Sequence, residues 1–313
     1  MKRTFTFAAA ALLAPALCCI GAISAGSGIA FAASDPVIAA AGDIACESAN
    51  ATPEPDERGS PVCHQAATAK LIAALRPAAV LALGDEQYPD GALAQFKSGY
   101  DKTWGAFKQI THPAPGNHEY HTPGAAGYFS YFGAAAGATG KGYYSFDLAG
   151  WHLVALDANC DQNGGCGPQS AEVQWLRKDL AAHHAACTLA FWHQPRFSSA
   201  KHHSDPTYDA FWRALYAAHA DVVLGGHDHT YERFAPQTPD AQADASRGIT
   251  EFVVGTGGRS HYAFTAIEPN SVVRNQRTFG VLALTLHAHG FDWNFIPEAG
   301  SPFRDTGSAR CHG

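Results

Sequence analysis

Four short, largely apolar runs, each followed at once by glycine or histidine, most constrain how this chain can fold. The runs are Pro36–Ala41, Ala79–Leu83, Thr188–Trp192 and Asp221–Leu224. Their length and their lack of polar alternation indicate strands that are buried on both faces of a sheet. Such a sheet needs helices over its faces, so the runs predict an α/β fold.

Helices are expected between these strands, and hairpins after them. Apolar residues recur at helical spacing in Gln65–Arg76, Phe96–Phe107, Gln169–His184 and Pro206–His219. Further strands are predicted at Tyr143–Leu148, Trp151–Leu156, Glu251–Val254, Val281–Leu286 and Phe291–Ile296, and a loop at Glu47–Pro61. This order predicts a mixed α/β sandwich in which helices cover the outer faces of the sheets.

The first 32 residues differ in character from the rest of the chain. Lys2 and Arg3 precede an uncharged run, Phe5–Ile23, and residues 30–32 form a small-x-small cleavage site. This pattern predicts a secretory signal peptide at 1–32, one catalytic domain at 33–313, and a secreted or periplasmic protein. A membrane anchor is the alternative, although Pro15 interrupts the run. No later segment is apolar for long enough to span a membrane.

Charge and cysteine content narrow the class of protein further. The formal net charge is −7, and loss of Lys2 and Arg3 with the signal would leave −9. An acidic chain without a basic cluster is not expected to bind nucleic acid. Six cysteines remain after the signal, and an even number in an exported chain predicts disulfides. Of 15 possible pairings, local closure favours Cys46–Cys63 and Cys160–Cys166, leaving Cys187–Cys311.

Five short motifs follow the predicted strands and carry the chemistry. They are GD at 42–43, GDEQY at 84–88, GNHE at 116–119, WH at 192–193 and GHDH at 226–229. Together they offer seven candidate metal donors: Asp43, Asp85, Tyr88, Asn117, His193, His227 and His229. This mixture of oxygen and nitrogen donors suits iron, zinc or manganese. Seven donors are too many for one such ion, so two neighbouring metal sites are expected.

The ordered motif set GD, GDxxY, GNHE, H and GHxH resembles the calcineurin-like metallophosphoesterases, and most closely the purple acid phosphatases. The resemblance implies a four-layer α/β/β/α sandwich with mixed sheets and a dinuclear metal site at the strand ends. It also implies that Asp43, Tyr88 and His229 hold one metal and that Asn117, His193 and His227 hold the other. Asp85 would bridge the two ions.

One departure from the wider family selects the subgroup. Many metallophosphoesterases have a ligating histidine two residues after the first aspartate, where this chain has Ala45. Tyr88 supplies the missing ligand in the purple acid subgroup, and a phenolate favours Fe(III). The expected centre is Fe(III) with Zn, Fe(II) or Mn(II), carrying a net charge of about +1 that attracts a phosphate ester. A metal-bound hydroxide would then attack phosphorus in line.

Three histidines are expected to bind phosphate and protonate the leaving group. His118 follows Asn117 in the GNHE motif, and the adjacent pair His202 and His203 matches a histidine pair of the plant-type enzymes. His118 and His203 are favoured for these catalytic roles.

The function expected is hydrolysis of small phosphomonoesters. Two alternatives remain open: a phosphodiesterase acting on nucleotides or phospholipid head groups, and a non-catalytic metal- or phosphate-binding protein on the same scaffold. The aromatic residues Tyr128, Phe129, Tyr131 and Phe132 could line a substrate rim, but core packing is favoured.

Overall fold

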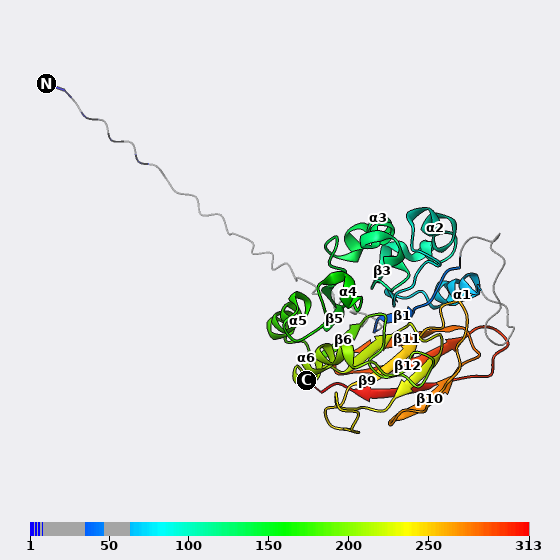
Figure 1. The fold of residues 1–313 in the computed structure, drawn as a ribbon. Coiled ribbons are helices and arrows are strands. Elements are labelled where there is room, and N and C mark those ends of the chain that lie inside the picture. Colours follow the sequence, from blue (N-terminus) through cyan, green and yellow to red (C-terminus); the bar gives the residue numbers. More distant parts are fainter. Residues whose placement is uncertain (3, 5, 7, 9–34, 47–62, 313) are drawn as a thin grey trace. The chain divides into compact units, whose positions relative to one another are not determined.

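The computed structural model describes residues 1, 2, 4, 6, 8, 35–46 and 63–312 (Figure 1). The chain divides into two units, Met1–Ser34 and Asp35–Gly313, and the second unit holds all the elements described below. The predicted signal peptide falls largely outside the described residues, and so does the predicted loop Glu47–Pro61. In the part of the chain that is described, no helix is long and apolar enough to cross a membrane.

The second unit is built on two mixed sheets. One sheet has the strand order β13-β12-β11-β1-β2-β3 and the other has the order β10-β8-β9-β7-β6-β5-β4. The strands of the first sheet are β1 (Val37–Ala41), β2 (Ala79–Ala82), β3 (Thr111–Pro113), β11 (Gly280–His287), β12 (Gly290–Pro297) and β13 (Thr306–Arg310). Those of the second are β4 (Tyr144–Leu148), β5 (Trp151–Ala155), β6 (Cys187–Phe191), β7 (Val222–Gly225), β8 (Tyr231–Phe234), β9 (Thr250–Val254) and β10 (Ser271–Asn275).

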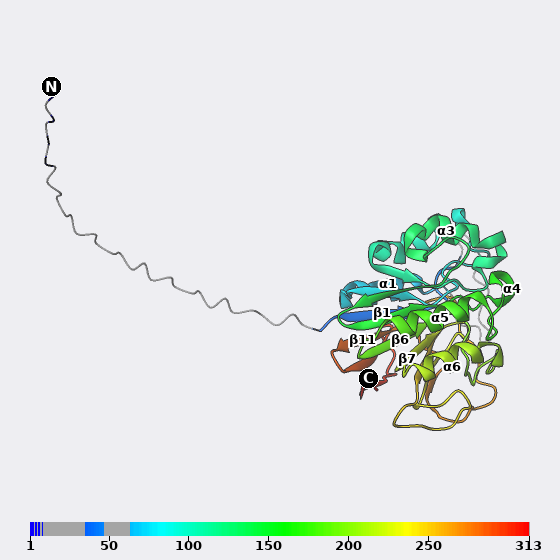
Figure 2. The ribbon, with the colours of Figure 1, turned by 90° about the vertical axis from the view of Figure 1, so that its left-hand side faces the viewer.

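The sheets pack face to face, with helices outside them. One apolar core joins the facing residues of both sheets, including Leu81, Leu284, Leu189 and Phe252. A second core lies between the other face of the β5–β6–β7 sheet and the helices α5 and α6. Figure 2 shows α1 and α3 on one side of the strands and α6 on the other. The predicted α/β/β/α sandwich is therefore confirmed.

The predicted helices are shorter in the structure than the sequence patterns suggest, and two described α-helices, α3 and α4, were not predicted. The described α-helices are α1 (Gln65–Leu75), α2 (Leu93–Ser98), α3 (Ala126–Phe132), α4 (Cys160–Asn163), α5 (Ala171–Ala182) and α6 (Asp209–Ala217). The start of α5 is fixed by Ser170, whose hydroxyl accepts a hydrogen bond from the Val173 N–H at 3.3 Å. The predicted helix Pro206–His219 is a 3₁₀ turn at Pro206–Tyr208 followed by α6.

The prediction of one helix over Phe96–Phe107 is wrong. Helix α2 ends at Ser98, and two 3₁₀ segments follow it, Tyr100–Lys102 and Trp104–Ile110. The cause is the buried Gln87, whose side-chain oxygen accepts a hydrogen bond from the Tyr100 N–H at 2.8 Å. A Cβ on Gly99 would lie 2.3 Å from that oxygen. Gly99 and the Gln87 side chain together interrupt the helix.

Two other predictions can be judged directly. The disulfides Cys46–Cys63, Cys160–Cys166 and Cys187–Cys311 are all present, which confirms the favoured pairing. The four aromatic residues at 128, 129, 131 and 132 lie on α3 or at its end and are buried in the first core. Core packing is thus their role, as expected.

Candidate metal centre

The candidate donors converge because they follow neighbouring strands. Asp43 follows β1 and Asp85 follows β2, which are parallel neighbours in one sheet. His193 follows β6 and His227 follows β7, which are parallel neighbours in the other. The carboxyl ends of these strands meet at one edge of the sandwich, the place where α/β sheets usually bind ligands.

The backbone at these strand ends turns sharply to aim the side chains inward. Asp43, Asp85 and His227 have φ angles of 59°, 49° and 66°, in the left-handed region that non-glycine residues seldom adopt. Glycines in the loops of the site let groups approach closely. A Cβ on Gly84 would lie 2.5 Å from His193 Nδ1, and one on Gly116 would lie 2.1 Å from Asp85 Oδ1. Backbone strain of this kind clusters at functional sites.

Three other candidate donors meet around the Tyr88 hydroxyl. The hydroxyl oxygen lies 2.9 Å from Asp43 Oδ1, 2.9 Å from Asp85 Oδ2 and 3.1 Å from His229 Nε2. His229 Nε2 also lies 3.2 Å from Asp43 Oδ1. All four side chains are nearly inaccessible to solvent. Their donor atoms thus form one compact cluster of three oxygens and one nitrogen.

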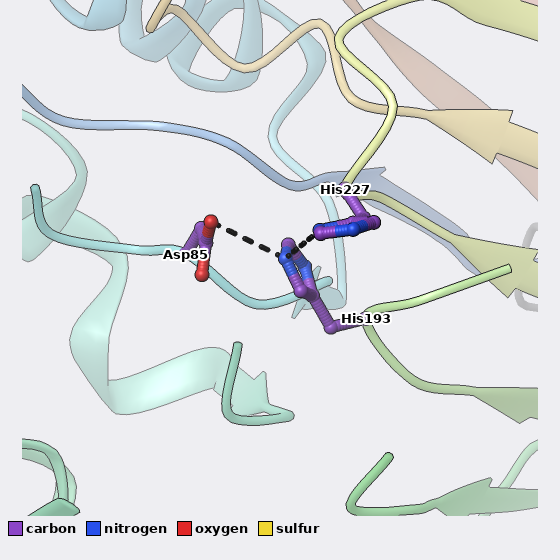
Figure 3. Close-up of side chains that lie close together, drawn as sticks. All are labelled: Asp85, His193 and His227. Atoms are coloured by element: carbon purple, nitrogen blue, oxygen red, sulfur yellow. Dashed lines mark hydrogen bonds and ion pairs between the residues drawn. The ribbon is translucent and has the colours of Figure 1, made fainter. Parts of the chain in front are cut away.

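A second cluster adjoins the first at Asp85. His193 Nε2 lies 3.3 Å from Asp85 Oδ2 and 3.2 Å from His227 Nδ1. Figure 3 shows the imidazole of His193 between the other two side chains. Donor atoms of these three residues lie within 4.8 Å of one another. The buried Oδ1 of Asn117 has no hydrogen-bond partner within the described part of the chain. Asp85 therefore contacts both clusters, the arrangement that a bridging carboxylate requires.

Burial and close contact between the donors shift the pKa values of His193, His227 and Tyr88. Burial alone would lower the pKa of His193, but the adjacent Asp85 raises it to about 9. Burial and the neighbouring His193 lower the pKa of His227 to about 3. Burial, Asp43 and Asp85 hold the pKa of Tyr88 well above its usual value. In the protein without ions, a proton on His193 offsets part of the negative charge of the buried carboxylates, and Tyr88 is a neutral phenol within hydrogen-bond distance of both.

The donor set fits a pair of transition-metal ions. It combines two carboxylates, a phenol, imidazoles and an unpartnered amide oxygen, as borderline metals prefer. Outer contacts orient two of the imidazoles: His193 Nδ1 lies 2.8 Å from the Leu83 carbonyl oxygen, and His229 Nδ1 lies 2.6 Å from Ser260 Oγ. Such contacts fix the ring so that its other nitrogen faces the centre.

The three predicted catalytic histidines have different surroundings. His118 is partly exposed, its Nδ1 lies 2.5 Å from the Pro89 carbonyl oxygen, and its Nε2 lies 3.8 Å from Asp85 Oδ2. His202 stacks on His227 with ring centroids 4.0 Å apart. His203 is exposed, and its Nδ1 lies 3.4 Å from Thr265 Oγ1. The contacts thus link His118 and His202 directly to the candidate donors.

Two acidic residues inside the motifs have structural partners. Asp228 accepts hydrogen bonds from the backbone N–H and from Nδ1 of His202, each at 3.0 Å, so it orients this histidine. Glu119 contacts backbone groups instead: it accepts from the N–H groups of Asp85, Gly116 and Gln87. It therefore joins the two loops that carry Asp85 and Asn117.

Sequence reasoning missed the segment after β9. Besides Ser260, this segment contributes Tyr262, whose ring stacks on His229 at 3.9 Å. It also contributes Arg259, whose guanidinium lies 5.1 Å from the centroid of the Tyr88 ring. The signal was present, because the glycine-rich residues 255–258 follow the predicted strand Glu251–Val254. They resemble the other strand ends but carry no carboxylate or amide donor.

Comparison with known proteins shows which family the chain belongs to. Residues 37–231 match the sequence model of the calcineurin-like phosphoesterase family. The chain belongs to this family. Purple acid phosphatase 15 of Arabidopsis thaliana is 31% identical over 175 residues, which make up 50% of this chain and 32% of that protein. Fe(3+)-Zn(2+) purple acid phosphatase 12 of the same plant is 24% identical over 263 residues, 69% of this chain and 53% of that protein.

The fold of the chain is also similar to that of a solved purple acid phosphatase. Purple acid phosphatase PPD1 from yellow lupin (Lupinus luteus) seeds superposes with a TM-score of 0.67 at 19% identity, covering 88% of this chain and 54% of that chain. The matches thus cover between about a quarter and about half of the lengths of the purple acid phosphatases. The expected resemblance to the family and to its purple acid phosphatase-like subgroup is confirmed.

Proposed function

We propose that this protein is a secreted, metal-dependent hydrolase of phosphomonoesters with two adjacent metal ions. The observation that carries the proposal is the contact of Asp85 with both donor clusters. Asp43, Tyr88 and His229 would hold one ion, and Asn117, His193 and His227 the other. Bound ions of this kind activate water and neutralise charge on phosphoryl oxygens. The three disulfides support export, because such bonds persist in oxidising compartments.

The chain's own residues supply proton transfer and substrate orientation. His118 Nδ1 can donate to the Pro89 carbonyl, so Nε2 is the nitrogen that exchanges a proton with a bound ester. In the same way, the hydrogen bond of His202 Nδ1 to Asp228 leaves Nε2 of His202 for substrate. We assign leaving-group protonation to one of these two and phosphate binding to the other, with His203 at the exposed rim. The buried ring of Tyr88 and the partly buried ring of Tyr262 pack against His229 and limit the access of bulk water from that side of the centre.

The metals proposed are Fe(III) with Zn, Fe(II) or Mn(II). A phenolate ligand favours Fe(III), and Tyr88 lies within hydrogen-bond distance of both carboxylates that would share the ion. One relative carries Fe(3+) and Zn(2+) in its name. Metal analysis of protein purified from its native compartment tests this assignment.

The decisive assay compares p-nitrophenyl phosphate with bis(p-nitrophenyl) phosphate. A monoesterase hydrolyses the first with the higher kcat/KM, whereas a preference for the second would identify a phosphodiesterase. Asp85→Asn should reduce kcat by a factor on the order of 100–1000, the range for loss of one strong electrostatic group. The exposed Asp240→Asn is the control. A protein that binds two metals yet hydrolyses neither ester would support the non-catalytic alternative.

A further inference from the structure

A pocket of about 450 Å³ opens beside Asn117. Four separate stretches of chain form its walls: 117–121, 158–162, Gln194 and 205–208. Two of these stretches reach the candidate metal centre: Asn117 is itself a candidate donor, and Gln194 directly follows the candidate donor His193. The pocket therefore adjoins the proposed phosphate site on the side of the Asn117 cluster.

The walls of this pocket are rich in groups that bind hydroxyls. Amides and hydroxyls come from Asn117, Asn159, Gln162, Gln194 and Thr207. Gln194 Nε2 donates to Asn159 Oδ1 at 3.4 Å, which fixes the amide, and the buried Gln194 Oε1 has no partner within the described residues. An alcohol hydroxyl that donates to this oxygen would satisfy it. Two aromatic side chains, Tyr120 and Tyr208, complete the lining.

The charges around this pocket are negative. Asp161 and Asp205 lie in its walls, and the lining residues in the described part of the chain include His121 but no lysine or arginine. Burial, followed by the charges of Asp205 and Asp161, raises the pKa of Tyr208 well above its usual value. Cations lie in another part of the site: the Lys201 ammonium lies 4.5 Å from the centroid of the Tyr262 ring, whose face stacks on His229.

The acidic wall is also held in place. The Cys160–Cys166 disulfide closes the loop that carries Asp161. Asn159 Nδ2 donates to the Pro115 carbonyl at 3.1 Å and to Asp157 Oδ1 at 2.8 Å, which ties this loop to the GNHE loop. Asp205 accepts from the Thr207 N–H at 2.8 Å. The two carboxylates therefore face any ligand from fixed stretches of backbone.

We propose that this pocket receives the alcohol part of a phosphomonoester and selects a neutral, hydroxyl-rich alcohol, such as a sugar, over one that carries a second phosphate. The proposal rests on the phosphomonoesterase function and specifies its substrate class. Amide groups, carboxylates and aromatic faces together suit a sugar, and a second phosphate would be repelled by Asp161 and Asp205.

Fructose 6-phosphate and fructose 1,6-bisphosphate form a matched pair of substrates for the test. At low ionic strength the kcat/KM should be about tenfold higher for the monophosphate than for the bisphosphate. The reason is that two carboxylates repel the second phosphate electrostatically through the solvent. The double variant Asp161→Asn/Asp205→Asn should reduce this ratio several-fold, as should high salt. The control is Asp240→Asn/Asp292→Asn, which removes the same charge from exposed positions outside the pocket.

The outcomes separate the pocket from the chemistry. A wild-type protein that hydrolyses both sugars but prefers the bisphosphate would overturn the pocket assignment and leave the phosphomonoesterase function standing. So would a ratio that shifts equally in the pocket variant and in the control, because total charge would then explain it. Failure to hydrolyse any monoester would overturn both. A ratio that responds only to the pocket variant supports the proposal.

Discussion

Replacement of Glu119 tests whether one buried carboxylate holds the two loops of the candidate metal centre. Glu119 Oε2 accepts hydrogen bonds from the N–H groups of Asp85 at 2.9 Å and Gly116 at 2.8 Å, and Oε1 accepts from Gln87 at 3.1 Å. The side chain is fully buried. Glu119→Gln keeps the shape but retains only one accepting oxygen, so the side chain can no longer accept all three hydrogen bonds.

The expected cost follows from the donor that loses its acceptor. If the remaining oxygen faces Asp85 and Gly116, the Gln87 N–H is left in a buried site opposite an amide NH₂. A buried unsatisfied donor costs about 1–3 kcal/mol in unfolding free energy. The loops that carry Asp85 and Gly116 should also be less firmly joined to each other. Metal affinity should therefore fall by about 10- to 100-fold, as it does when other groups that orient metal ligands are removed.

Urea unfolding of metal-free protein and competition with a chelator measure the two effects. The experiments belong at pH 8, because burial and the charge of Asp85 raise the pKa of Glu119 to about 7. The matched control is Glu172→Gln, another buried carboxylate, which accepts from the Asp157 N–H at 2.7 Å and from Asn163 Nδ2 at 2.9 Å. The control should lose stability but keep its metals. Equal loss of metal in both variants would refute the positioning role of Glu119.

Three further outcomes can be measured. Tyr88→Phe should abolish a visible charge-transfer band, and a colourless, fully active protein containing only zinc or manganese would contradict the Fe(III) assignment. Cys187→Ala/Cys311→Ala should lower the unfolding free energy by about 4–5 kcal/mol, since that disulfide spans 124 residues; a urea-derived loss below about 1 kcal/mol would count against the estimate. Burial alone would lower the pKa of His152, but hydrogen bonds to Asp179 and Asp147 raise it. Its stabilisation should therefore be complete below about pH 6.5 and lost as the pH rises through the folded-state pKa, and His152→Asn should flatten that part of a urea-midpoint profile.

The buried strands could be predicted because each is an apolar run that ends in a recognisable polar motif. The structure places strands at or within one residue of Pro36–Ala41, Ala79–Leu83, Thr188–Trp192 and Asp221–Leu224. Strands β3 and β8 were not predicted, and the edge strands β10 and β13 were missed as well. The residues of β10 and β13 alternate between exposed and partly buried, and they include glycine, serine and arginine, so no apolar pattern marks these two strands. The break after α2 depended on the distant Gln87, which local periodicity cannot reveal.

The geometry of the candidate site also has two causes: strand register within each sheet and contact between the two sheets. Parallel pairing of β1 with β2 sets Ala41 beside Ala82, and the turns that follow continue this register, with Asp43 N–H donating to the Gly84 carbonyl at 3.0 Å. Pairing of β6 with β7 sets Phe191 beside Leu224, so that Gly226 N–H donates to the His193 carbonyl at 2.8 Å. Each pair of donors is therefore a consequence of strand register, which short motifs at strand ends already imply.

What joins the two pairs is contact between the sheets. The His227 N–H donates to Asp43 Oδ2 at 2.8 Å, and His193 Nδ1 lies 2.8 Å from the Leu83 carbonyl oxygen, so each sheet binds the strand ends of the other. These bonds need the small Gly226, because a Cβ there would lie 2.8 Å from both Asp43 Oδ2 and the Leu83 oxygen. A larger residue at 226 would force the sheets apart at this edge and would separate Asp43 from His229 while leaving each strand pair intact. The candidate metal centre is thus a property of the sandwich, and no single motif contains it.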